Sequence, residues 1–146
     1  MVLDVGGGIG GLYDSLSRWV QCDYTLLDLS PEAMKLAQAA GVKKTVAADI
    51  DGVRLPFDDN SFDMVIGTDI LEHVRNPWVL LAEMARVSRK NIFIYSPNFA
   101  SLGCRWDLLR GRPIRQMSAD KYGSVFDPNG RHVDHIYFLT YANTAH

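Results

Sequence analysis

Five glycines occupy the six positions from Gly6 to Gly11, directly after an apolar run, residues 2–5, that carries one acid, Asp4. A short apolar run that stops at glycines is typical of a buried parallel strand followed by a tight turn. Glycine permits a positive φ and lets a ligand lie directly on the backbone, where a Cβ would collide with it. The free N–H groups of a helix expected over residues 12–20 point back at the same turn. This stretch favours a nucleotide-like ligand at a strand end over a bare turn that only packs a helix on a sheet.

Two acids have positions that suit separate parts of such a ligand. In the arrangement Asp-x-Gly-x-Gly-x-Gly, Asp4 precedes Gly6, Gly8 and Gly10. A carboxylate there repels a pyrophosphate and attracts a cationic amino-acid group. Asp28 ends a second apolar run and lies about 20 residues beyond the glycines, where an acid accepts hydrogen bonds from ribose hydroxyls. The alternative for Asp28 is a residue that caps a turn.

The glycines also satisfy a second pattern, Gly6-x-Gly8-x-x-Gly11, which is the dinucleotide-binding fingerprint. This pattern raises the alternative of a nicotinamide-dependent oxidoreductase. Two observations disfavour that alternative: Asp4 is poorly placed for a pyrophosphate, and the sequence contains no Tyr-x-x-x-Lys pair.

Strands and helices alternate along the chain in an order that positions these residues. We expect five strands, over residues 2–5, 24–28, 45–49, 64–67 and 92–96. The alternation predicts an α/β fold, a Rossmann-like parallel sheet of order 3-2-1-4-5 with right-handed crossovers and helices on both faces. Because the carboxyl ends of parallel strands meet at one edge of the sheet, we expect the glycines and the strand-end acids to gather there.

Local signals set the limits of two further helices. Ser30 with Pro31 begins one helix as its N-cap and first residue, and Gly41 ends it. The pair Asn76-Pro77 begins another helix, whose core-facing residues we expect to be Trp78, Leu81, Met84 and Val87.

The Asp-x-Gly-x-Gly-x-Gly stretch resembles motif I of the class I S-adenosylmethionine-dependent methyltransferases. Two further segments, Pro56–Asp63 before an apolar strand and Leu71–Val74 after it, are similar to the subfamily usually called type 11. The resemblance covers about two-thirds of the chain, from Val2 to Ser96. It implies S-adenosyl-L-methionine as the cofactor and methyl transfer to a small-molecule acceptor as the activity.

The same resemblance implies a role for each matching residue. Asp4 and the three motif glycines hold the amino-acid portion of the cofactor, and Asp28 holds its ribose. At the end of the third strand, the Asp49 carboxylate and the Ile50 N–H contact the adenine. Asp51 competes with Asp49 for this role, and a solvated acidic loop is the alternative.

The segment after the fourth strand supplies the remaining candidates. By resemblance, the backbone at Thr68 and Asp69 borders the methionine part of the cofactor. His73 is a candidate general base because imidazole titrates near neutral pH. We favour the alternative, a histidine that shapes the pocket through local hydrogen bonds, since methyl transfer requires mainly the alignment of nucleophile, methyl and sulfur.

Near and beyond Ser96 the sequence resembles a narrower group, the methionine-biosynthesis W proteins, in three segments: Tyr95–Phe99, Arg105–Pro113 and Asp127–Asn129. Those proteins are associated with a homoserine acyltransferase. The resemblance implies an alternative function, a non-catalytic or weakly catalytic cofactor-binding module that regulates this acyltransferase. The chain departs from the pattern at His132, which an extra residue precedes.

Residues 97–146 interleave aromatic side chains with arginines. One interpretation is a cap that recognises an anionic group of the acceptor, and the other is an irregular cover whose aromatics pack on the sheet. The helix before the first strand and the final hairpin of the resembled family have no complete counterpart, so we expect a fold truncated at both ends. An uncovered edge of the fifth strand then favours a homodimer.

Length and composition bound these interpretations. A chain of 146 residues suits one methyltransferase-like domain, with a cofactor-binding core over 1–96 and an irregular cap over 97–146. The net charge of -2 argues against nucleic acid or an anionic membrane as the main partner. Cys22 and Cys104 lack metal-ligand spacing, and no apolar run is long enough to span a bilayer. We therefore expect a cytoplasmic protein without a metal site.

Overall fold

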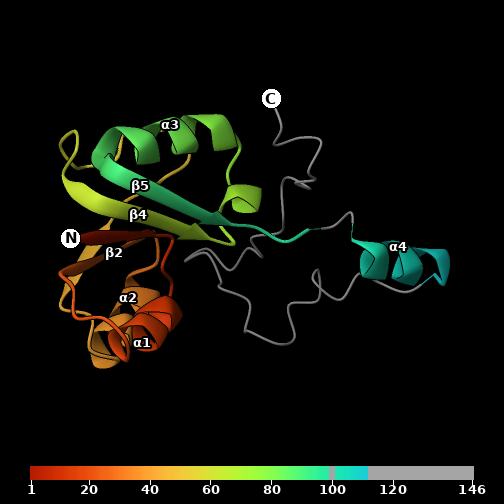
Figure 1. Ribbon diagram of the computed structural model, residues 1–146, viewed down its shortest axis with the longest axis horizontal. Coiled ribbons are helices and arrows are strands. Elements are labelled where there is room, and N and C mark those ends of the chain that lie inside the picture. The colour runs from red at the N-terminus through yellow and green to blue at the C-terminus, as the bar shows by residue number, and fades with distance from the viewer. Residues whose placement is uncertain (99–100, 112–146) are drawn as a thin grey trace.

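The computed structural model describes residues 1–98 and 101–111. Within them, five parallel strands form one sheet in the order β3-β2-β1-β4-β5, which confirms the predicted order (Figure 1). Their shared direction places all five carboxyl ends at one edge of the sheet. The strands are β1 (Val2–Val5), β2 (Tyr24–Asp28), β3 (Lys44–Ala47), β4 (Phe62–Thr68) and β5 (Ser88–Tyr95).

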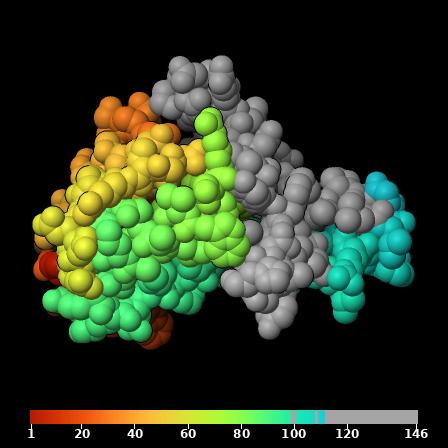
Figure 2. Space-filling view, turned by 90° about the horizontal axis from the view of Figure 1, so that it is seen from above, coloured from red at the N-terminus to blue at the C-terminus, as the bar shows by residue number. Residues whose placement is uncertain are grey.

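Helices cover both faces of this sheet, which confirms the predicted Rossmann-like architecture. α1 (Gly11–Ser17) and α2 (Pro31–Ala39) lie on one face, and α3 (Pro77–Val87) lies on the other (Figure 1). A 3-10 turn, η1 (Leu71–His73), precedes α3, and α4 (Leu102–Leu109) follows β5. Figure 2 looks onto the α3 face and shows the connection before β4 beside it. No helix in the described part of the chain is long and apolar enough to cross a membrane.

The central strand β1 contributes to both faces because its side chains alternate in direction. Leu3 and Val5 are buried in the larger core together with side chains of α3. Asp4 lies between them and therefore faces the smaller core, on the side of α1 and α2. The buried members of the smaller core are Tyr24, Leu26, Met34, Ala37 and Val42.

The two predicted helix starts are confirmed by side-chain caps. The hydroxyl oxygen of Ser30 accepts a hydrogen bond from the N–H of Ala33 at 3.2 Å. The Oδ1 atom of Asn76 accepts one from the N–H of Val79 at 3.4 Å. Each cap is followed by a proline at the first helical residue, where an N–H would have no partner within the helix.

The predicted core face of α3 is wrong in part. Trp78 is 49% exposed, although the spacing of apolar residues placed it in the core. Trp78 lies about 160° round the helix from the buried Leu80, two residues further on, so both cannot face the sheet. The buried residues of this helix are Pro77, Leu80, Met84 and Val87.

Four predicted bounds differ from the structure by two residues or more. β3 ends two residues early, at Ala47, because its pairing with β2 stops there. β4 begins two residues early, at Phe62, which pairs with Ser88. β5 begins at Ser88, directly after α3, and α1 ends at Ser17 rather than at residue 20. The limits of a strand depend on its pairing with a segment far away in the sequence, and the periodicity of apolar residues does not reveal that pairing.

A single arginine of α3 holds the connection between β3 and β4. The Arg86 guanidinium donates to the carbonyl oxygens of Leu55 at 3.1 Å and of Phe57 at 2.9 Å. It also pairs with Asp59 at 2.6 Å and with Glu83 at 2.7 Å. Arg86 is only 17% exposed, so these bonds are partly shielded from water.

Removing this arginine is expected to loosen the connection. Arg86→Ala deletes the donors to two backbone carbonyls, so we expect the Tm, measured by circular dichroism, to fall by several degrees. Arg54→Ala is the matched control, because Arg54 pairs with the same Asp59 at 3.4 Å but is 71% exposed. An exposed pair contributes little, so this control should keep the wild-type Tm. Equal losses in the two variants would contradict the role given to Arg86.

Candidate functional site

The glycine loop (residues 6–10) is bound to the carboxyl end of β2. Its first two N–H groups both donate to the carbonyl oxygen of Leu27, at 2.8 and 3.2 Å. The third, the N–H of Gly8, donates to Oδ2 of Asp28 at 2.8 Å. Three consecutive backbone donors thus meet two consecutive residues of the neighbouring strand, and the position of the loop depends on β2.

The glycine loop is closed on one side and open on the other. A Cβ on Gly7 would lie 2.5 Å from Oδ2 of Asp4 and 2.6 Å from Cγ of Leu26, so a larger residue does not fit without movement of its neighbours. At Gly8, whose φ is +54°, a Cβ would meet no atom of the described residues within 4 Å. Gly8 therefore presents bare backbone toward open space, as expected for a ligand that lies on the backbone.

Asp28 ends β2, as the sequence predicts, and its carboxylate makes two structural contacts, of which the one with Ser30 matches the turn-capping alternative. Its Oδ2 accepts from Gly8, and its Oδ1 accepts from the N–H of Ser30 at 2.8 Å. Each carboxylate oxygen has a second lone pair, so the half-buried Asp28 can still accept from hydroxyl groups. The bond to the glycine loop was missed because it depends on the distance between two strand ends.

Asp4 is the buried acid of the site. It is 1% exposed, and its Oδ2 accepts a hydrogen bond from the Tyr24 hydroxyl at 2.5 Å. Its Oδ1 has no hydrogen-bond partner in the part of the chain that the structure describes. Burial raises the pKa of Asp4 to about 6, the bond from Tyr24 acts to lower it, and the charge of Asp28 raises it. The carboxyl group therefore titrates close to neutral pH.

Tyr24 is a site residue that the sequence analysis missed. In the register of β1 and β2, Val2 pairs with Tyr24 and Asp4 pairs with Leu26, so Tyr24 and Asp4 are diagonal neighbours. Such neighbours lie within reach of an aromatic side chain. Burial and the charge of Asp4 raise the pKa of Tyr24, which keeps the hydroxyl as the donor. The sequence feature that could have revealed this residue is a tyrosine at the first position of a buried strand.

The two acids that follow β3 and compete for the adenine role differ in their partners. Asp49 is exposed, and its Oδ1 accepts from the N–H of Asp51 at 2.8 Å. The Asp51 carboxylate accepts from the N–H of Arg75 at 2.9 Å and pairs with its guanidinium at 3.4 Å. Arg75 thus engages Asp51, and Asp49 remains the more accessible acid. Ile50 is half-buried against the larger core.

The segment after β4 lies against the glycine loop. The side chain of Ile70 occupies the space that a Cβ on Gly6 would need. Asp69 is exposed with a φ of +50°, and its N–H donates to the carbonyl oxygen of Tyr95 at 2.9 Å. His73 follows in η1 with a half-buried side chain. The ends of β1, β2 and β4 therefore converge, as the parallel sheet predicts.

The site edge is rich in acceptors. Beyond the predicted acids, Glu72 is 0% exposed and accepts from the Ser96 hydroxyl at 3.2 Å. Carboxylates suit a ligand with ammonium and hydroxyl donors better than a polyphosphate. Three features fit a ligand that has an amino-acid part and a ribose: the bare backbone at Gly8, the Asp4 oxygen that has no partner among the described residues, and the remaining lone pairs of Asp28. Among the residues that the structure describes, no group of three or more His, Cys, Asp or Glu side chains is arranged to hold a metal ion.

The chain is similar to known proteins over this same region. A family model described as a methyltransferase domain matches residues 3–95. The norajmaline N-methyltransferase of Rauvolfia serpentina is 34% identical over 92 residues, which cover 60% of this chain and 32% of that protein. An uncharacterized methyltransferase of Mycobacterium marinum is 38% identical over 91 residues, which cover 60% of this chain and 34% of that protein.

A solved structure shares the architecture. The S-adenosylmethionine-dependent methyltransferase of Mesorhizobium loti is 25% identical, with a TM-score of 0.52, over 66% of this chain and 42% of that chain. The present chain spans about a third of the length of the curated relatives it matches.

The buried acid predicts a pH-dependent stability. The pKa of Asp4 in the folded chain, about 6, lies above the ordinary value of 3.8, so the folded state binds this proton more tightly than the unfolded state. The stability that this proton contributes is full below about pH 4 and is lost as the pH rises through about 6. A shift of this size corresponds to about 3 kcal/mol. Between these pH values, Asp4→Asn should gain free energy of unfolding relative to the wild type.

Urea unfolding of both proteins at a series of pH values measures this difference. Asp23→Asn is the control, since Asp23 is an exposed acid. Its free energy of unfolding should follow that of the wild type at every pH. A difference between Asp4→Asn and the wild type that does not vary with pH would show that Asp4 titrates at its ordinary pKa.

Proposed function

This chain belongs to the methyltransferase family, and we propose that it transfers a methyl group from S-adenosyl-L-methionine to a small-molecule acceptor. The observation that supports this most is the hydrogen bond between the Gly8 N–H and the Asp28 carboxylate. It joins the open backbone at Gly8 to an acid that has lone pairs left for the hydroxyls of a ligand, at the carboxyl edge of the sheet. The cofactor of the family carries an amino-acid part and a ribose, the two groups that these elements suit.

Each part of the cofactor has a proposed partner in the chain. The amino-acid part lies along the glycine loop, above the charge of Asp4, and Asp28 accepts from the ribose hydroxyls. Asp49 and the Ile50 N–H contact the adenine, which the exposure of Asp49 supports. The backbone at Asp69 borders the methionine part.

When bound, S-adenosylmethionine supplies a methyl group on a positively charged sulfur. The chain contributes mainly alignment, because acids at two ends of the ligand fix the direction of its reactive centre. We assign His73 to the shaping of the pocket beside the end of β4. Removal of a proton from the acceptor by His73 is the alternative role.

We assign acceptor recognition to the cap, residues 97–146, and cofactor binding to the core, residues 1–96. Directly after α4, the Arg110 guanidinium lies 4.5 Å from the ring centroid of Trp106 of that helix, and both side chains are exposed. An aromatic ring beside a cation suits an acceptor with a planar or anionic group. Most of the cap lies outside the described residues. The name of the Rauvolfia relative makes nitrogen compounds the first acceptors to screen.

Three expectations from the sequence stay predictions. The first is the resemblance to the methionine-biosynthesis W proteins, and with it a module that regulates an acyltransferase. Of the three segments that carry it, Asp127–Asn129 lies outside the described residues and the other two lie mostly within them. Pairing of two copies through the edge strand β5 is supported by Phe93 and Tyr95, which are exposed on that strand. A cytoplasmic location is the third.

The nicotinamide alternative is disfavoured by the acid beneath the glycine loop.

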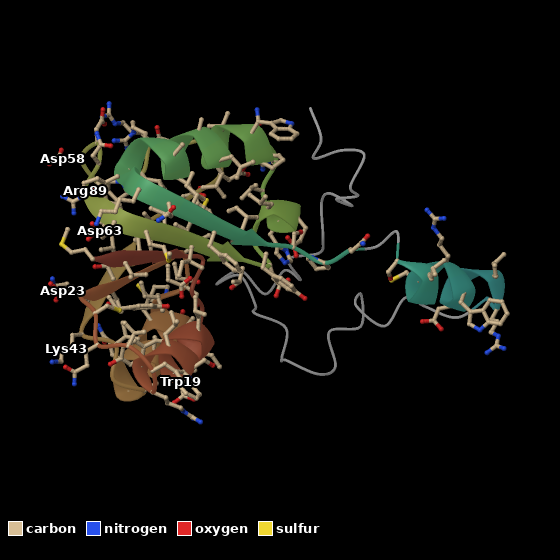
Figure 3. All side chains as sticks on the ribbon, in the orientation of Figure 1. Trp19, Asp23, Lys43, Asp58, Asp63 and Arg89 are labelled. Carbon is tan, nitrogen blue, oxygen red and sulfur yellow. The ribbon has the colours of Figure 1, made fainter. Side chains whose placement is uncertain are left out.

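The first test is calorimetric titration with the product, S-adenosylhomocysteine. We expect micromolar affinity for the wild-type chain and a loss of about tenfold or more in Asp28→Ala, which lacks both the ribose acceptor and the partner of Gly8. Asp23→Ala is the matched control, because Asp23 is an exposed acid next to the opposite end of β2 (Figure 3). Unchanged affinity in Asp28→Ala contradicts the assigned ribose contact, and no binding by the wild type contradicts the proposed cofactor.

Transfer is tested separately, with S-adenosylmethionine that carries a labelled methyl group and a panel of amine, hydroxyl and thiol acceptors. We expect label in one class of acceptor, a large loss of transfer in Asp28→Ala and wild-type transfer in Asp23→Ala. Cofactor binding without transfer to any acceptor, together with co-purification of an acyltransferase, would favour the regulatory module instead.

A further inference from the structure

Asp4 and Tyr24 form a buried acid–phenol pair beneath the glycine loop. The Tyr24 hydroxyl donates to Oδ2 of Asp4 at 2.5 Å, and Gly7 packs against this same oxygen. The other oxygen, Oδ1, has no hydrogen-bond partner within residues 1–98 and 101–111. A buried carboxylate that accepts one hydrogen bond from a neutral donor is unfavourable to ionise.

The elements packed around this pair are largely apolar. The ring of Tyr13, from α1, lies edge-on to the ring of Tyr24, with their centroids 5.2 Å apart. From α2, Met34 and Ala37 belong to the same core cluster as Tyr24. From β4, Ile66 is the register partner of Asp4.

The charges that act on the pair are acidic. Asp28 raises the pKa of Asp4, and the charge of Asp4, with a smaller effect of Cys22, raises that of Tyr24. Burial acts in the same direction on both groups and is the largest cause for each. Against these effects, the Tyr24 hydroxyl is the group that favours the ionised form of Asp4.

We propose that Tyr24 is a positioning residue for cofactor binding: its hydroxyl holds Oδ2 of Asp4 under the glycine loop and keeps the charge of this carboxylate available to a cationic amine on the open side of the loop. This inference rests on the proposed function, because the ligand must carry an amino-acid part. A ligand with the same adenosine but without the amine should not respond to Tyr24.

The protonation state of Asp4 determines whether ligand affinity rises or falls with pH. Above its pKa of about 6 the carboxylate is charged and attracts an ammonium group, and below that pKa it is neutral. Affinity for an amine-bearing ligand therefore rises as the pH increases through about 6. Loss of the phenol hydroxyl removes the group that favours ionisation, so the pH at which affinity rises moves upward.

The experiment is calorimetric titration of the full chain with S-adenosylhomocysteine and with methylthioadenosine, which lacks the amino-acid part, from about pH 5 to about pH 8. For the wild type we expect the affinity for S-adenosylhomocysteine to rise about tenfold around a midpoint near pH 6, and the affinity for methylthioadenosine to stay constant. In Tyr24→Phe the midpoint should rise by about one pH unit. Tyr13→Phe is the matched control, which removes a hydroxyl from the neighbouring ring and should keep the wild-type profile.

The outcomes separate this inference from the proposed function. The same pH profile for both ligands, or an unmoved midpoint in Tyr24→Phe, overturns the positioning role and leaves the proposed function standing. No binding of either ligand at any pH overturns both. Should Tyr24→Phe fail to fold, a carbon-13 NMR titration of the ligand-free wild type decides, with the Asp4 carboxyl carbon and the Tyr24 ring carbon that bears the hydroxyl followed together. A Tyr24 signal that shifts with the same midpoint as the Asp4 carboxyl supports the pair, and a Tyr24 signal that does not shift as Asp4 titrates overturns it.

Discussion

The backbone donors at the start of the glycine loop find their acceptors on the neighbouring strand, and the rest of the site depends on this arrangement. Where the backbone leaves β1, its N–H groups no longer have the regular hydrogen-bond partners of a strand. A buried donor left unpaired costs about 1–3 kcal/mol. The carbonyl of Leu27 and the carboxylate of Asp28 remove that penalty by accepting three consecutive N–H groups. The loop can therefore stay open at Gly8 without unpaired donors beneath it. The open side of the glycine loop is thus a consequence of the parallel pairing of β1 with β2.

Two acids near the glycine loop have neutral partners, whereas an acid at the amino edge of the sheet pairs with cations. At the amino edge, Asp63 pairs with Arg89 and with Lys90, each at 2.9 Å (Figure 3). At the carboxyl edge, Asp4 accepts from a phenol and Asp28 accepts from backbone amides. Acids that are neutralised by cations contribute to the scaffold. Acids whose partners are neutral keep a negative potential at the edge where a cationic ligand would bind.

Asp4 illustrates how such a potential is maintained inside a fold. Its burial disfavours the ionised form, and the hydrogen bond from Tyr24 opposes that effect without adding a positive charge. A lysine or arginine in place of the phenol would neutralise the carboxylate and remove its attraction for a ligand amine. A neutral donor is therefore suited to holding an acid that has to remain attractive to a cation. In the proposed methyl transfer, alignment matters most, and a fixed charge beneath the loop would contribute to it.

The sequence by itself determined the order of the sheet, the starts of two helices and the edge at which the candidate site lies. These follow from local signals: apolar periodicity, N-cap residues, and a glycine run that Asp4 precedes and Asp28 follows at a set spacing. Only the tertiary structure decided that Tyr24 lies under the loop beside Asp4 and that Asp28 also anchors Gly8. These contacts depend on strand register, which joins residues far apart in the chain. The sequence also suggested that α3 faces the core through Trp78, whereas packing against the sheet buries Leu80, because what a helix covers sets its rotation about its axis.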